Sequence, residues 1–266
     1  MRKDFVQILK EGKVDIKREY NRLYQLFYAR DPNDYHSTSV YDDINNSFSD
    51  VWFRGTALNL DDFDEEYGFN FEINPENLNI DILVDFCEYF YNFVQCSLGY
   101  DATFYTTHIL KVIDKIGYKT VFVEGLVKFV ENDPVAISVA EILPNDVSYR
   151  ALMYNHHSLK GNIEAKKEIL LKLADLLEPK DKCLNQINSQ FKSDLFNAFN
   201  NLNLRHNNVD PKDKGHYRKY VDEMKKSELE KWYDEVYQMC LLAFLLLEHA
   251  ERKPKFDELM KNVNAK

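Results

Sequence analysis

The chain has 266 residues, of which 45% are hydrophobic and 29% are charged, and its formal net charge at pH 7 is −10. The chain contains only 8 glycines and 7 prolines but 17 tyrosines and 18 phenylalanines. This composition excludes a collagen-like or a mostly disordered protein, because it is poor in Gly and Pro and rich in large side chains to bury. No apolar run reaches the ~18 to 20 residues of a membrane span, and charges interrupt residues 1–20, where a signal core would lie. We therefore expect a cytoplasmic protein that has no membrane partner.

The N-terminal half is predicted to be an acidic helical module. Apolar residues three or four apart indicate helices over residues 14–29 and 75–93, with Pro75 in the first turn of the second, and a third helix over 103–116. Residues 31–100 contain a single basic residue, Arg54, against 15 acidic ones. Such a charge asymmetry favours a protein partner at this half and disfavours nucleic acid there.

A small β-hairpin is predicted after the third helix. Gly117 fits the helix stop, and residues 118–131 are then rich in β-branched and aromatic side chains. Glu124-Gly125 interrupts this stretch and predicts the turn.

Only helices are predicted after the hairpin. Asp133 and Pro134 supply a cap and a first-turn proline, Asn162 opens the next pattern, and Pro179 ends it. The predicted helices cover residues 133–143, 162–177, 184–202, a short segment near 216–225, and a last helix from Ser227. Such a set is typical of an up-and-down helical bundle.

The last helix carries two further predictions. Ser227 and Glu230 have capping-box spacing, so we expect Ser227 to be the cap. Behind them the helix is apolar nearly all round, which predicts either packing against the N-terminal half or a two-fold interface between two copies. We expect a homodimer.

Four cysteines are present, Cys87, Cys96, Cys183 and Cys240. They form no CxxC pair and have no close histidine partner, so reduced cysteines are expected in place of a zinc site or disulfides. His156-His157 is a weak metal pair, because no carboxylate lies three or four positions away on either side. Because GxGxxG, Walker, HExxH and GxSxG motifs are also missing, neither a metal nor a cofactor is expected.

The most informative segment follows the helix over 184–202. Residues 200–208 contain five asparagines, Arg205 and His206, and residues 205–226 carry seven basic residues against four acidic ones. One interpretation is a helix end and loop, because asparagine favours caps and turns. The other is a site where arginine binds phosphate and histidine moves protons.

Several motifs in the second half resemble those of bacterial abortive-infection (AbiJ-like) proteins. They are His157-Ser-Leu-Lys-Gly-Asn162, Lys166-Lys-Glu-Ile-Leu170, Leu177-Glu-Pro179 and Asn201-Leu-Asn-Leu-Arg-His-Asn-Asn208, followed by the leucine-rich last helix. The C-terminal half of those proteins resembles the HEPN superfamily, whose members are often dimeric helical bundles found in toxins and phage-defence ribonucleases. The resemblance implies a HEPN-like bundle that binds RNA and carries a metal-independent ribonuclease site.

The HEPN nuclease signature is an arginine, usually followed by Asn, Asp or His, with a histidine after four to six intervening residues. Arg205-His206 fits its first half, whereas the next histidine, His216, follows Arg205 after ten intervening residues. Arg150 with His156, and Arg30 with His36, have the expected spacing, but roughly 0.7 such matches are expected at random, so chance explains both. Arg150 with His156 stays open as a second pair.

The sequence thus predicts a mainly α fold with an N-terminal helical module over 1–157, a hairpin near 118–131, and a HEPN-like bundle over 158–266. The expected function is RNA binding, and endoribonuclease activity, in phage defence. The predicted catalytic residues are Arg205, His206 and His216. The predicted RNA-binding residues are Asn207, Asn208, Lys212, Lys214, Arg218 and Lys219.

The alternative is a non-catalytic HEPN-like regulatory protein that acts through its acidic N-terminal half. Within that half the tract 61–72 is rich in acidic and aromatic residues. It lacks the ligand order of an EF-hand loop, so it is best read as a solvated surface whose aromatic rings pack inward. Mimicry of a nucleic-acid backbone for a partner is the remaining interpretation of this tract.

Overall fold

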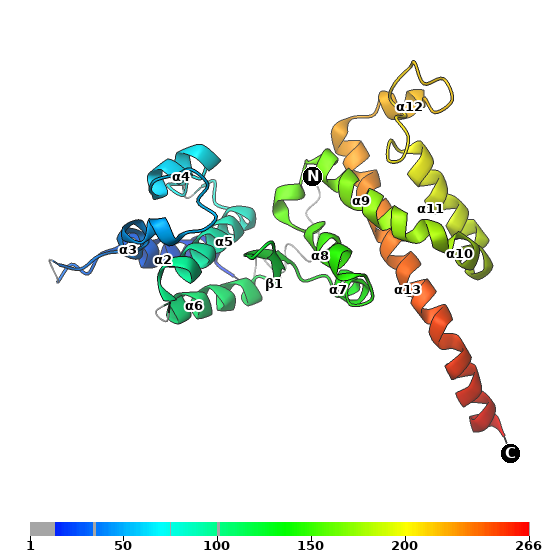
Figure 1. Cartoon of the computed structure of the whole chain (residues 1–266), viewed down its shortest axis with the longest axis horizontal. Coiled ribbons are helices and arrows are strands. Elements are labelled where there is room, and N and C mark those ends of the chain that lie inside the picture. Colours follow the sequence, from blue (N-terminus) through cyan, green and yellow to red (C-terminus); the bar gives the residue numbers. More distant parts are fainter. Residues whose placement is uncertain (1–13, 34–35, 75, 100–101, 266) are drawn as a thin grey trace. The chain divides into compact units, whose positions relative to one another are not determined.

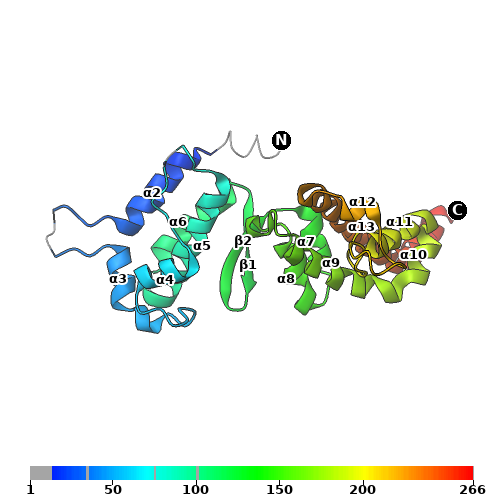
Figure 2. The same cartoon turned by 90° about the horizontal axis from the view of Figure 1, so that it is seen from above.

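The structure is a computed structural model that describes residues 14–33, 36–74, 76–99 and 102–265. It is mainly helical with one two-stranded antiparallel hairpin (Figures 1 and 2), so the predicted mainly α fold with a small hairpin is confirmed. Among the described residues, no helix combines the length and the apolar character needed to cross a lipid bilayer.

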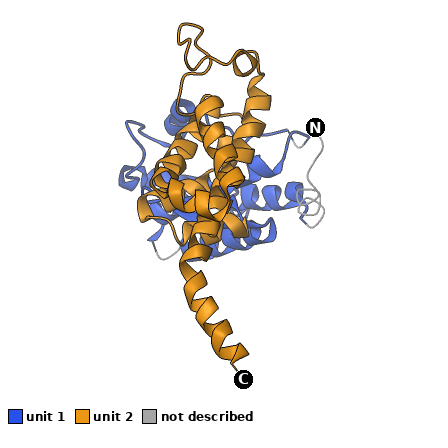
Figure 3. Ribbon diagram, turned by 90° about the vertical axis from the view of Figure 1, so that its right-hand side faces the viewer, with its two compact units in different colours: residues 1–132 blue, residues 133–266 orange. Residues whose placement is uncertain are grey.

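The chain forms two compact units, and the boundary lies after Asn132 (Figure 3). The sequence had suggested 1–157 and 158–266 instead. The difference arises because α7 (Pro134–Ala140) and α8 (Asn145–Met153) pack with later helices: α7 contacts α13 and α8 contacts α9. The two helices therefore belong to unit 2.

Unit 1 is organised around α5, which contacts α2, α3, α6 and strand β2. Its described residues form the helices α2 (Ile16–Tyr28), α3 (Val40–Asn46), η1 (Phe48–Asp50), α4 (Leu60–Tyr67), α5 (Ile80–Ser97) and α6 (Ala102–Lys115). Helix α5 begins later than predicted, because the side chain of Asn79 accepts a hydrogen bond from the Ile82 amide and caps it. Pro75, the predicted first-turn proline, lies outside the described residues.

Aromatic rings fill the core of unit 1. Phe27 on α2 is fully buried, and its ring meets that of Phe90 on α5 at 4.7 Å between centroids. In the acidic tract, Phe63 and Phe71 are buried as expected, but Tyr67 is 49% exposed. The tract therefore buries only part of its aromatic surface.

The predicted hairpin is confirmed, with β1 (Tyr118–Val123) paired to β2 (Leu126–Glu131). Glu124 and Gly125 both have positive φ, 51° and 85°, as the tight primed turn of a hairpin requires. The hairpin is fixed to α5 because the Glu88 carboxylate accepts hydrogen bonds from the Phe129 amide at 2.6 Å and from Lys128 Nζ at 2.9 Å.

Unit 2 is a helical bundle in which α13 contacts α7, α9, α10 and α11. After α7 and α8, its helices are η3 (His157–Leu159), α9 (Ile163–Leu177), η4 (Glu178–Lys180), α10 (Asp181–Ile187), α11 (Ser189–Asn201), α12 (Lys219–Asp222) and α13 (Lys226–Asn264). The predicted limits of α9 are confirmed, with Asn162 as its cap. The single helix predicted over 184–202 is wrong, because Asn188 breaks it and caps α11 through the Phe191 amide.

The capping box predicted for the last helix is also wrong. Lys225 is the N-cap residue of α13, and Ser227 lies in its first turn. The Glu230 carboxylate instead accepts hydrogen bonds from Lys166 Nζ at 2.8 Å and from the Gly161 amide at 2.7 Å. A buried ammonium group attracts a carboxylate more strongly than an exposed backbone amide does, so the tertiary contact replaces the local one.

Lys166 is the centre of a buried ionic cluster between α9 and α13. It is 6% exposed, and its Nζ also lies 2.7 Å from Asp234 Oδ1, which accepts a further hydrogen bond from the Tyr154 hydroxyl. Burial raises the pKa of Glu230, but the hydrogen bonds from Lys166 and Gly161 outweigh this effect and hold it below its ordinary value. The cluster fixes the start of α9 against α13.

All four cysteines are unpaired, as expected, although Cys183 is exposed and only Cys87 and Cys240 are fully buried.

Candidate functional site

The predicted site residues lie on the loop 202–218, which connects α11 to α12, and on the first residue of α12. Figure 1 shows this loop at the end of unit 2 where α13 begins. The loop is organised by Asn208, whose side chain is fully buried. An RNA-binding role was predicted for Asn208, but burial excludes its amide from any contact with a ligand on the surface.

The Asn208 amide satisfies three backbone groups of the loop. Its Nδ2 donates to the carbonyl oxygens of His216 at 2.6 Å and Asn200 at 3.1 Å, and its Oδ1 accepts from the Asn203 amide at 2.7 Å. The backbone of Asn208 also accepts from the Arg218 amide at 2.8 Å. Asn208 therefore holds both arms of the loop together.

This arrangement brings His206 and His216 together. Their rings stack with centroids 3.9 Å apart and planes inclined by 17°. The sequence identified both residues but did not predict their contact, because the nine residues between them form a loop whose conformation local patterns do not predict. Two side chains that can each accept or donate a proton thus lie side by side on a partly exposed surface.

Asp213 completes the cluster, and sequence reasoning missed it. Its Oδ2 lies 3.0 Å from His216 Nδ1, and this hydrogen bond is the main cause that lowers the pKa of the Asp213 carboxyl. A carboxylate on Nδ1 favours the tautomer that keeps its proton there and leaves Nε2 able to accept one. The spacing of three residues between Asp213 and His216 was the available signal.

Arg205 has contacts of another kind. Its guanidinium donates to the Ala174 carbonyl oxygen at 3.3 Å and lies 3.5 Å from a carboxylate oxygen of Glu178. It also lies over the rings of Phe196 and Phe199, at 5.7 and 5.0 Å from their centroids. The guanidinium group thus contacts α9, η4 and α11, so this residue fixes the loop to the helices.

The remaining predicted residues are exposed but differ in their partners. Asn207, Lys212 and Lys214 form no side-chain hydrogen bond or ion pair with the described residues. Arg218 donates from Nε to Asn201 Oδ1 at 2.7 Å, and Lys219 forms an exposed pair with Glu223. Lys212 and Lys214 have no ion-pair partner among the described residues, and the exposed pair of Lys219 is weak. All three lysines can therefore bind an anion.

The alternative pairs are used for local structure. Both ends of the Arg30 guanidinium bind the carboxylate of Asp42 at 2.7 Å. His156 Nδ1 accepts from the Ser158 amide at 3.2 Å and caps η3. Arg150 lies over the ring of the adjacent Tyr149.

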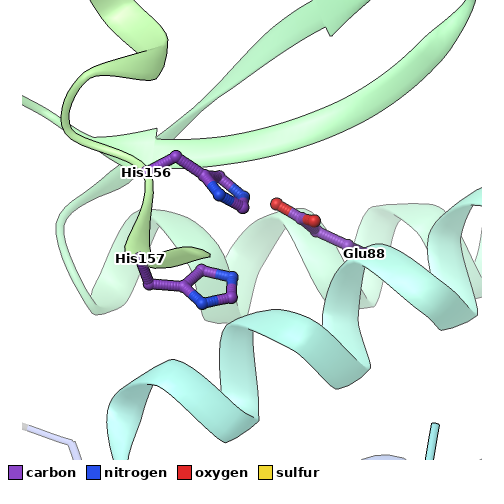
Figure 4. Close-up of side chains that lie close together, drawn as sticks. All are labelled: Glu88, His156 and His157. Atoms are coloured by element: carbon purple, nitrogen blue, oxygen red, sulfur yellow. The ribbon is translucent and has the colours of Figure 1, made fainter. Parts of the chain in front are cut away.

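Figure 4 shows the side chains of His156 and His157, which are consecutive residues of unit 2. Their ring centroids lie 4.3 Å apart. It also shows Glu88, which belongs to α5 of unit 1 and binds the hairpin strand β2 there. Glu88 and His156 thus each have a structural role within their own unit, and the His157 ring contacts that of His156.

Comparison with known proteins gives no match to a family model, to a curated protein or to a solved structure. The resemblance to abortive-infection proteins therefore depends on the sequence motifs alone, and the site is interpreted from its own geometry.

We expect Asn208→Ala to lower the free energy of unfolding of unit 2 by about 1–3 kcal/mol, because several buried backbone groups lose their partner. Urea denaturation measures the change, and the NMR signals of the His206 and His216 rings should shift at the same time. The neighbouring exposed Asn207→Ala is the control and should change stability by less than about 0.5 kcal/mol. Equal effects of the two substitutions would contradict the role assigned to Asn208.

Proposed function

We propose that unit 2 binds RNA and cleaves it by metal-independent acid–base chemistry, in the phage-defence role implied by the HEPN resemblance. The observation that carries the proposal is the stack of His206 on His216 with Asp213 bound to His216 Nδ1. Two histidines and nearby cations are sufficient for this reaction, because the 2′-hydroxyl of RNA already lies beside the scissile phosphate.

In the proposed reaction, His216 Nε2 removes the proton of the 2′-hydroxyl, and the resulting oxygen attacks phosphorus. The bond from phosphorus to the 5′-oxygen breaks, and protonated His206 gives its proton to that oxygen, leaving a 2′,3′-cyclic phosphate. The two rings, whose centroids lie 3.9 Å apart, are assigned to the entering and the leaving oxygen of this displacement.

The cations of the loop supply the charge that binds and stabilises the phosphate. Lys212 and Lys214 are exposed and have no ion pair with described residues, so they are assigned this role. Arg205 is a positioning residue in this scheme, since its guanidinium contacts Glu178 and the Ala174 carbonyl oxygen.

We expect the purified protein to degrade total RNA or tRNA in the presence of EDTA. His206→Ala and His216→Ala should each lower the rate by about 10²–10⁴-fold, and Asp213→Asn by about 10–100-fold, because it removes the group that orients His216. His249→Ala, an exposed histidine on α13, is the matched control and should keep full activity. Intact RNA at high concentrations of the wild-type protein would rule out the enzyme.

RNA affinity should depend weakly on salt, because three or four cations neutralise few phosphates. We expect the logarithm of affinity to fall against the logarithm of salt concentration with a slope of about −2 to −3 for single strands. Reversing Lys212 and Lys214 to glutamate should weaken binding uniformly across sequences, measured by anisotropy of labelled RNA. The same reversal at Lys255 and Lys261, exposed near the end of α13, should have little effect. Unchanged affinity in the loop variant would contradict the assignment of the phosphate site.

In this proposal the protein forms a homodimer through the C-terminal part of α13. This part of α13 projects away from the other helices of unit 2 (Figures 1 and 3), and residues 251–264 are all exposed. Its large apolar side chains recur at helical spacing, with Phe256 57%, Leu259 55%, Met260 37% and Val263 64% exposed. An apolar stripe of this kind is typical of a helix that pairs with another helix.

Sedimentation at tens of micromolar should therefore detect a dimer. Leu259→Asp places a charge in the stripe and should shift the protein to monomer, whereas Glu258→Lys, outside the stripe, should leave the dimer intact. A wild-type monomer at these concentrations would remove the two-fold interface from the proposal.

A second candidate function is a non-catalytic HEPN-like regulator. The contacts of Arg205 with Glu178, Ala174 and two phenylalanine rings favour this second function, because they give the arginine of the nuclease signature a structural role. In this case a protein partner would bind the acidic surface of unit 1, where Asp61, Asp62, Glu65 and Glu66 are exposed. The RNA degradation experiment separates the two functions.

A further inference from the structure

Unit 2 contains a groove that the proposed reaction does not use. It has a volume of about 380 Å³ and lies between α11 and α13, with the α12 region at one end. The lining residues on which the inference depends are Asn197, Leu202, Tyr220, Met224, Trp232 and Glu235. Its volume falls within the range of sites that bind small molecules, about 300–1,000 Å³.

The walls of the groove fit a flat, apolar ring. Trp232 is 46% exposed and Tyr220 is 70% exposed, so a ligand can reach part of each aromatic side chain. Met224 and Leu202 provide polarisable and apolar surface between them. Exposed aromatic side chains in a groove are the usual platform on which unpaired nucleobases stack.

The polar edge of the groove limits the ligand further. Glu235 forms no hydrogen bond or ion pair with the described residues, and its carboxylate can only accept protons in hydrogen bonds. Asn197 Oδ1 accepts a hydrogen bond from Asn201, which leaves the Asn197 NH₂ group to donate. Asp194, a second carboxylate in the lining, makes the groove unfavourable for a phosphate. The ligand that fits is a neutral ring with adjacent donors and an acceptor.

The groove is continuous with the basic loop. Asn201, which lines the groove, accepts a hydrogen bond at 2.7 Å from Nε of Arg218, the last residue of the loop. The exposed Lys219 and Lys225 directly adjoin the lining residues Tyr220 and Met224 in the chain. A ligand ring in the groove would thus have cations beside it for a phosphate attached outside.

We propose that the groove binds an unpaired guanine base of the RNA strand whose phosphates lie on the loop 202–218. Guanine presents two adjacent N–H donors, which suit the Glu235 carboxylate, next to a carbonyl acceptor, which suits the Asn197 NH₂ group. Adenine and uracil do not offer this order of groups. The inference rests on the proposed function, because it takes RNA as the source of the base.

The first test uses the fluorescence of Trp232. The chain has only two tryptophans, and Trp52→Phe leaves Trp232 as the sole tryptophan, which is excited selectively above the tyrosine absorption band. We expect saturable quenching by guanosine 5′-monophosphate that is clearly stronger than quenching by the adenosine and uridine monophosphates. Inorganic phosphate controls for anion binding to the lysines and should not quench.

The second test measures the anisotropy of labelled hexanucleotides that contain either guanine or adenine. Trp232→Ala should weaken binding of the guanine hexanucleotide by about 5- to 100-fold, and Trp232→Phe should restore most of it, because stacking returns with the ring. Glu235→Gln should reduce the preference for guanine over adenine by about tenfold. Phe122→Ala, an exposed aromatic on the hairpin of unit 1, is the matched control. Thermal unfolding confirms that each variant folds.

The outcomes separate this inference from the proposed function. Absent quenching, or equal quenching by all three nucleotides, overturns the guanine site even if the protein still cleaves RNA. Selective quenching by guanosine monophosphate without RNA cleavage keeps the guanine site and removes the ribonuclease. If Trp232→Ala converts a dimer to a monomer and leaves nucleotide binding unchanged, the groove is a contact between two copies and the inference fails.

Discussion

The candidate site depends on one buried amide. Asn208 bonds to the backbone of residues on both arms of the loop 202–218, and a fully buried amide with these partners tolerates no other geometry without losing hydrogen bonds. The His216 carbonyl oxygen is one of its partners, so the position of the His216 ring against His206 follows from this contact. A loop of this length without secondary structure would otherwise sample many conformations.

The helices supply the rigid support that such a loop requires. Lys166 joins α9 to α13 through two carboxylates, and Arg205 joins the loop to α9 and α11. Breaking a buried pair leaves an uncompensated charge, so the Lys166 cluster fixes one arrangement of these helices. The histidines, the exposed lysines and the aromatic groove can then occupy one end of the bundle, and in the proposed function a strand of RNA contacts all three there.

Much of the fold was readable from local signals. The hairpin, its Glu124-Gly125 turn and the limits of α9 follow from side-chain period, turn residues and caps, all of which act within a few residues. The errors occurred where a distant partner competed with a local signal. Glu230 has capping-box spacing but binds Lys166, and the apolar pattern over 184–202 continued across Asn188, which ends one helix and caps the next.

For the site, the sequence by itself determined which side chains could act: it identified Arg205, His206, His216 and the basic residues of the loop, because residue type and charge are local properties. Only the tertiary structure decided their roles. It buried Asn208, turned Arg205 to Glu178, and brought Asp213 and His206 to His216. The physical reason is that a loop conformation is set by hydrogen bonds between residues separated in the chain, and spacing alone does not encode those partners.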